Sequence, residues 1–182
     1  YTRHFIGLIN DLRKLTVKNK NTQNLNKSNL KKLNNIAHLK SFPSKIKSVN
    51  SVYQDFNIFI KDFEYFISTE LKAPSKDLSL QDKIFEGIIN RLDFLNNYKN
   101  ITLRIYLESQ KKPKYFLNLS KNINDYFNLF LNTHIEKTIS HIIYVYAFNV
   151  WIEDNNSMDK TMASIGNAFD NLNRVKSFMR IR

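Results

Sequence analysis

The spacing of apolar residues predicts α-helices along most of the chain. In successive stretches, apolar side chains recur every three or four positions, which places them on one face of a helix. Convincing alternation of apolar and polar residues, the pattern of a half-buried strand, does not occur. The predicted helices cover about residues 4–18, 29–41, 43–71, 79–96, 98–109, 113–130, 134–153 and 156–179. The pattern therefore predicts an all-α protein with eight or nine helices.

Local signals place several helix ends. Pro43 and Pro113 each suit the first turn of a helix, where the missing N–H of proline removes no hydrogen bond. Ser79, with Asp82 three residues later, resembles a capping box and begins the helix that ends near residue 96. Asn156 is placed to cap the last helix. No linker is long enough to require two separately folded domains.

The positive charge is concentrated at the start of the chain. Of a net charge of +12, residues 1–50 carry eleven Lys or Arg residues against a single acid, Asp11. A basic segment of this kind attracts the phosphates of nucleic acid or of anionic lipid, although a solvated face with no partner also accounts for it. The residues that we expect to contact such phosphates are Lys27, Lys31, Lys32, Lys40, Lys45 and Lys47.

Composition excludes most familiar enzyme classes. The chain has no cysteine and only three glycines, so thiolate catalysis, cysteine-ligated zinc and glycine-rich phosphate loops are excluded. His134 and His141 lie seven residues apart on one predicted helix, about 10 Å along its axis, which is too far for one metal ion. Glu153, Asp154 and Asp159 lie at a helix junction, which favours capping. We expect no catalytic residue, metal or cofactor.

The sequence contains no predicted membrane-spanning helix. The longest apolar stretch, residues 142–152, would extend only about 16 Å as a helix, roughly half of a bilayer. The chain begins at Tyr1, is strongly basic and lacks cysteine, which suits a mature organellar protein after removal of a presequence. We therefore expect a location in the mitochondrial matrix or on the matrix side of the inner membrane, with the bacterial cytoplasm as the alternative.

Three segments in residues 80–180 resemble a known family. The runs Asp82–Glu86 and Arg91–Leu95 look like the opening of the ligand domain in alphaproteobacterial TetR-like regulators. Residues 152–161, with Asp154, Ser157 and Asp159, resemble the acidic cap before the last helix of that family, and Thr161 matches its threonine loosely. The same cap is similar to one in the mitochondrial coenzyme Q biosynthesis lipid-binding family. The resemblance implies a TetR-like fold.

The resemblance also implies a division of the chain. Residues 1–48 would correspond to the helix-turn-helix region and residues 49–182 to the helical C-terminal domain. The run Phe42–Lys45 resembles the "F-x-S-K" run that begins the connecting helix of TetR proteins. No glycine occurs between Gly7 and Gly87, so the tight turn between two DNA-binding helices is not provided for. We therefore expect a degenerate, basic helix-turn-helix region.

The last two predicted helices are the candidate interaction surface. The resemblance implies either a dimer interface there, as in TetR-like proteins, or an isoprenoid-sized pocket, as in the coenzyme Q relatives; core packing is the plain alternative. A pocket would be lined by Phe85, Phe116, Phe127 and Phe130. The candidate interface or lipid-facing residues are Ile143, Tyr146, Val150, Trp151, Ile165, Phe169 and Leu172.

Our leading hypothesis is a non-catalytic accessory or scaffold subunit of a larger mitochondrial assembly, derived from a TetR-like ancestor. The assembly would be the ribosome, where the basic segment would meet rRNA, or an inner-membrane respiratory complex. Other protein subunits would be its partners. The first alternative is a lipid-binding helper of coenzyme Q (ubiquinone) biosynthesis. The second is a homodimeric TetR-type transcriptional regulator.

Overall fold

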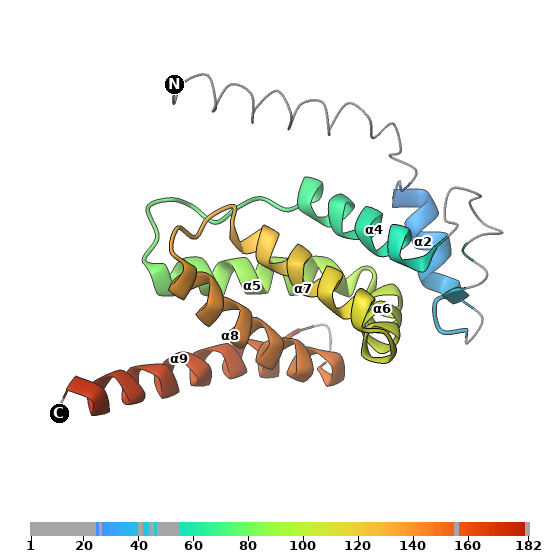
Figure 1. The fold of residues 1–182 in the computed structure, drawn as a ribbon. Helices are drawn as coiled ribbons and strands as arrows, with labels where there is room; N and C mark the ends of the chain where they lie inside the picture. Colours follow the sequence, from blue (N-terminus) through green and yellow to red (C-terminus); the bar gives the residue numbers. More distant parts are fainter. Residues whose placement is uncertain are drawn as a thin grey trace, which may run out of the picture.

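The chain folds into packed helices. The computed structural model describes residues 25, 27–39, 42–43, 46, 55–154 and 157–180, with side chains up to residue 174. These ranges contain seven α-helices and no strand, so the predicted all-α class is confirmed (Figure 1). The predicted helix over residues 4–18 lies outside the described residues. The helices are α2 (Lys27–Ile36), α4 (Phe56–Glu70), α5 (Leu80–Asn96), α6 (Lys99–Lys111), α7 (Pro113–Phe127), α8 (His134–Glu153) and α9 (Asp159–Arg180).

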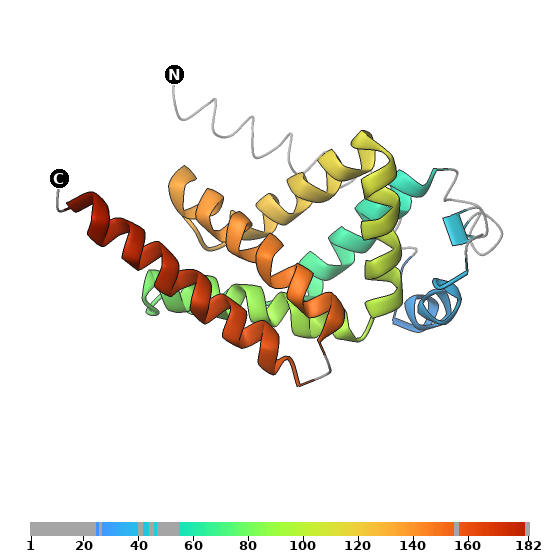
Figure 2. The same ribbon diagram turned by 90° about the horizontal axis from the view of Figure 1, so that it is seen from below.

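Three consecutive helices enclose the centre of the molecule. Seen from below, α6, α7 and α8 follow one another like the sides of a triangle. Helix α4 passes behind α6, and α5 runs along the edge beside α8 and α9 (Figure 2). Helix α9 packs along α8 and also contacts α5, while α2 packs on α6 at one end (Figure 1). In the described part of the chain, no helix has the length and apolar character needed to cross a bilayer.

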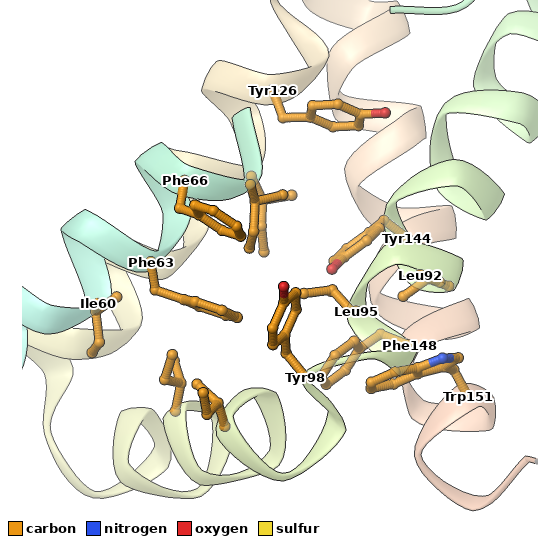
Figure 3. Packing of buried hydrophobic residues seen from close by; sticks show 14 of the residues in the cluster. Ile60, Phe63, Phe66, Leu92, Leu95, Tyr98, Tyr126, Tyr144, Phe148 and Trp151 are labelled. Carbon is orange, nitrogen blue, oxygen red and sulfur yellow. The ribbon is translucent and has the colours of Figure 1, made fainter. Parts of the chain in front are cut away.

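The core is rich in aromatic side chains that meet between α4, α5 and α8 (Figure 3). Phe63 and Phe66 of α4 each make an edge contact with the ring of Tyr98. On the other side, Phe148 stacks on Trp151, whose ring centroid lies 5.4 Å away. Edge and stacked ring pairs add to the free energy gained by burying these large side chains.

Several predicted helix ends are confirmed, but the prediction of a single helix over residues 43–71 is wrong, because Asp55 is extended and caps α4, which begins at Phe56. Helix α5 begins after Ser79, whose Oγ accepts a hydrogen bond from the Asp82 N–H at 3.2 Å. Helix α7 begins at Pro113. Helix α8 has the predicted bounds, and its capping box joins Thr133 to Glu136. The hydrogen bond from the Thr133 N–H lowers the pKa of the Glu136 carboxyl below its ordinary value.

Asp154 has the predicted capping role at the junction between α8 and α9. Its Oδ2 accepts hydrogen bonds from the N–H of Thr161 at 2.7 Å and from the Thr161 hydroxyl at 2.8 Å. Lys99 holds the other side of the junction, because its Nζ donates to the carbonyl oxygens of Trp151 and Asp154. Met158 has a φ of 59°, in the left-handed region, so this turn is backbone-strained for a non-glycine residue. These contacts fix the angle at which α9 returns along α8.

Helix α2 is joined to the helices that follow it. Leu30 and Leu33 are buried, and the Oδ1 of Asn34 accepts a hydrogen bond at 3.1 Å from the N–H of Ile101. That N–H is one of the donors in the first turn of α6 that have no partner within the helix. Asn34 therefore caps α6 from a neighbouring helix.

Candidate functional site

A cavity of about 270 Å³ lies between helices α4 to α8. Helices α6, α7 and α8 supply most of its wall, while α4 and α5 supply its floor. Most of the lining is apolar. The lining residues are Phe63, Glu64, Arg91, Leu95, Thr102, Ile105, Tyr106, Ser109, Gln110, Phe116, Leu119, Ser120, Ile123, His141, Tyr144, Val145, Phe148 and Asn149.

A buried ion pair forms part of the cavity floor. The Nη2 of Arg91 lies 2.6 Å from the Oε2 of Glu64, and both side chains are at least nine-tenths buried. The Nε of the same guanidinium donates a hydrogen bond at 3.1 Å to the hydroxyl of Tyr144. Arg91 of α5 thus links α4 and α8 through charge-assisted hydrogen bonds.

Two aromatic rings surround the guanidinium. Its central carbon lies 5.4 Å from the ring centroid of Tyr126 and 5.6 Å from that of Tyr144. Burial is the largest single influence and lowers the pKa of Arg91, but the charge of Glu64 and the interactions with Tyr144 together outweigh it and raise that pKa above its ordinary value. Burial also raises the pKa of both tyrosines, so they stay neutral at neutral pH. The cation is therefore permanent and held by one carboxylate and two ring faces.

The cavity as a whole carries no net charge. Among the described residues that line it, Glu64 and Arg91 are the only acidic and basic side chains apart from His141. Burial lowers the pKa of His141, which favours its neutral form at neutral pH. Since the two opposite charges face each other directly, neither is left to bind an ionic group of a ligand.

Three hydroxyl groups in the wall bond within the protein, whereas the buried Nδ1 of His141 has no hydrogen-bond partner among the described residues. The Thr102 hydroxyl donates to the carbonyl of Tyr98 at 3.0 Å, and the Ser109 hydroxyl donates to the carbonyl of Tyr106 at 2.6 Å. The hydroxyl of Tyr106 lies 3.4 Å from the Oδ1 of Asn149, joining α6 to α8. Within the described ranges, no cluster of His, Asp or Glu residues is arranged to hold a metal ion. The site is suited to binding by shape and apolar contact.

The predicted pocket aromatics fall at different depths. Phe116 lines the cavity and is exposed at its mouth. Phe127 is fully buried in the core, where its ring packs edge-on against Tyr144, and Phe85 and Phe130 pack against the core outside the lining. All four lie on predicted apolar stripes, so spacing alone did not separate a cavity wall from packed core.

Glu64 and Arg91 were not among the predicted site residues. Both lie on apolar helix faces: Glu64 follows Ile60 by one turn, and Arg91 falls on the stripe formed by Ile84, Ile88 and Leu95. A charge at such a position must be paired when it is buried. A charged residue on an apolar helix face was therefore the signal in the sequence that could have identified Glu64 and Arg91 as a buried pair.

The predicted interface residues of the last two helices lie mostly inside the chain. Ile143, Trp151, Ile165 and Phe169 are buried, Val150 and Leu172 are half-buried, and Tyr146 is exposed. The four buried residues therefore pack in the core of the chain. The exposed apolar residues of α8 are Ile135, Ile142, Val145 and Tyr146.

The predicted basic residues are described only in part. Lys27, Lys31 and Lys32 are exposed on α2, and the Nζ of Lys27 lies 2.7 Å from the Oε2 of Glu70. Lys40, Lys45 and Lys47 lie outside the described residues.

No protein-family model, curated protein or solved structure matches this chain.

Proposed function

We propose that this protein is a non-catalytic carrier or helper that holds one uncharged, largely apolar small molecule in the cavity between α4 and α8. The observation that supports this is an apolar cavity of about 270 Å³ whose two buried charges cancel each other. Small-molecule sites are usually concave and apolar with a few fixed polar groups. This function corresponds to the lipid-binding alternative drawn from the sequence.

The cavity size favours a lipid-like segment. An enclosed apolar cavity of about 150 Å³ already holds one benzene ring. The cavity of about 270 Å³ is therefore large enough for a short alkyl or isoprenoid segment, and its opening lets the rest of a longer molecule extend outward.

The compensated ion pair favours an uncharged ligand. A carboxylate entering the cavity would find Arg91 already bonded to Glu64 at 2.6 Å. It would be a third charge without a counter-charge, and such burial costs several kcal/mol. An alcohol with the same chain avoids this cost, so decanol should bind at least about a hundredfold more tightly than decanoate.

Calorimetric titration of the protein with decanol and with decanoate at pH 7 tests this function. Ser120→Phe fills the cavity from α7 and should abolish decanol binding, while Asn124→Phe, one turn further along α7 and exposed, should leave it unchanged. Equal binding of both ligands would contradict the argument from charge. Decanol binding that survives Ser120→Phe would contradict the assignment of the cavity.

The exposed apolar face of α8 favours a second candidate function, that of an accessory subunit in a mitochondrial assembly. Exposed apolar side chains that share one helix face mark contact sites. Native purification of the endogenous protein, with sizing and mass spectrometry, tests it. Migration with a particle far larger than the 21.6 kDa chain would support it, and migration as a free monomer or dimer would contradict it.

A further inference from the structure

We infer that the mouth of the cavity docks on the surface of an anionic phospholipid bilayer. The contact is made by the lysine-rich turn between α6 and α7 together with the mouth rim, which we define as Phe116 and Leu117 of α7 and Ile142, Val145 and Tyr146 of α8. The inference rests on the proposed function, because it explains how a poorly soluble ligand reaches the cavity.

The mouth rim exposes large apolar side chains. The exposed fractions are 57% for Phe116, 66% for Leu117, 63% for Ile142, 46% for Val145 and 50% for Tyr146. Phe116 and Val145 also line the cavity, so the exposed apolar surface joins the cavity wall at these two side chains. The aromatic and aliphatic groups are of the types that enter the headgroup region of a bilayer.

Three lysines lie within six residues of Phe116 and Leu117, the α7 part of this rim. Lys111, Lys112 and Lys114 surround Pro113, which begins α7 three residues before Phe116. All three lysines are exposed.

Their interactions in the protein are weak ones. The Nζ of Lys111 lies 3.0 Å from the Oε1 of Glu108, and that of Lys114 lies 3.5 Å from the Oδ2 of Asp55. The Nζ of Lys112 lies 5.2 Å from the ring centroid of Tyr115. The Lys114–Asp55 pair is exposed and contributes little, while the buried Glu108 keeps a second partner in Arg104 at 2.9 Å. The ammonium groups can therefore exchange these partners for lipid phosphates.

The combination of features favours a bilayer over other partners. A nucleic acid would use the lysines but leave Leu117 and Ile142 facing water. A protein seated on the rim would cover the opening through which the ligand must pass. A bilayer satisfies the lysines with its headgroups, takes up the apolar side chains, and delivers an apolar ligand without passage through bulk water.

Vesicle co-sedimentation of the full chain tests the inference, with phosphatidylcholine vesicles compared with vesicles that also contain phosphatidylserine. The variant Lys111→Gln/Lys112→Gln/Lys114→Gln should weaken binding to the anionic vesicles by about a hundredfold, since each lysine near the surface contributes about fivefold. Its matched control, Lys27→Gln/Lys31→Gln/Lys32→Gln, removes the same charge from α2 and should bind as the unmodified chain does. If only the control variant binds the anionic vesicles more weakly, the inference is overturned, and the basic N-terminal segment makes the contact instead.

A second pair of variants tests the apolar contribution. Leu117→Ser/Ile142→Ser changes exposed rim residues that do not line the cavity, and should reduce vesicle binding by about tenfold or more. Leu80→Ser/Leu129→Ser removes similar exposed groups from the start of α5 and from the α7–α8 connection, neither on the exposed face of α8, and should have no effect.

The decanol titration separates failure of docking from failure of the cavity. The rim variants should bind decanol in solution as the unmodified chain does. Vesicle binding that is absent, or equal in rim and control variants, would overturn the docking inference even if decanol binds. Absence of decanol binding alone would overturn the proposed function and leave the vesicle result to decide whether the surface docks.

Discussion

Replacing Glu64 with glutamine should destabilise the protein by about 3 kcal/mol. The carboxylate and the guanidinium of Arg91 are 2.6 Å apart, and at an effective dielectric constant of about 20 their attraction is about 6 kcal/mol. The amide oxygen of glutamine still accepts a hydrogen bond, and the rings of Tyr126 and Tyr144 still face the cation. We therefore expect about half of the attraction to be lost as net stability, at the lower end of the cost of breaking a buried pair.

Urea unfolding followed by circular dichroism measures this loss. A domain stabilised by about 5–15 kcal/mol would show a clearly lower midpoint with an unchanged slope. The companion variants are Glu64→Leu, Arg91→Met and the double variant Glu64→Leu/Arg91→Met. In the double variant no charge is left without a partner, so it should be at least as stable as Glu64→Gln. Its loss in free energy of unfolding should be smaller than the sum of the losses of its two single variants.

Two results would refute this reasoning. A loss below about 1 kcal/mol for Glu64→Gln would mean that water reaches the pair and that it behaves as an exposed one. If the loss of stability in the double variant equals the sum of the two single losses, the two side chains act independently.

The Glu64→Gln variant also links stability to ligand choice, because it leaves the charge of Arg91 without a counter-charge in the cavity lining. It should bind decanoate more tightly than the unmodified chain does.

Three further substitutions test local features by the same unfolding assay. Asp154→Ala removes both hydrogen bonds to Thr161 and should cost about 2–3 kcal/mol; an unchanged midpoint would contradict the capping role. Gly87→Ala gains helix propensity, but the added Cβ would lie 2.5 Å from the Cζ of Phe130, so a net loss of about 1 kcal/mol is expected. The Cβ added by Gly166→Ala meets nothing within 4 Å, so this variant should gain about 0.5–1 kcal/mol. Urea midpoints that move the same way in both glycine variants would contradict this contrast.

Helix positions could be predicted because their signals are local. The bounds of α5, α7 and α8 follow from a capping serine, a proline and a long apolar repeat, each read within a few residues. The capping role of Asp154 was predicted for the same reason, since its partner Thr161 is only seven residues away.

The cavity could not be predicted from the same signals. Whether an apolar side chain fills the core or faces an opening depends on how α6, α7 and α8 cross, and no local repeat encodes that crossing. Phe116 and Phe127 occupy similar positions in the apolar repeat of α7, yet one stands at the mouth and the other is fully buried. Of the exposed apolar residues of α8, only Tyr146 was among the predicted interface residues, because the helix is apolar on nearly every side.

The ion pair and the cavity are connected through the spacing of the helices. Hydrogen bonds from Arg91 to Glu64 and Tyr144 join α4, α5 and α8 and hold these helices at the reach of an arginine side chain. Apolar side chains at these positions would have no preferred distance and would pack inward until the space was filled. The polar group at the floor is thus a reason for the cavity to stay open, at the cost of two desolvated charges. A protein selected for stability alone would gain by replacing the pair, so its place in the cavity floor favours a function in which an open, uncharged site matters.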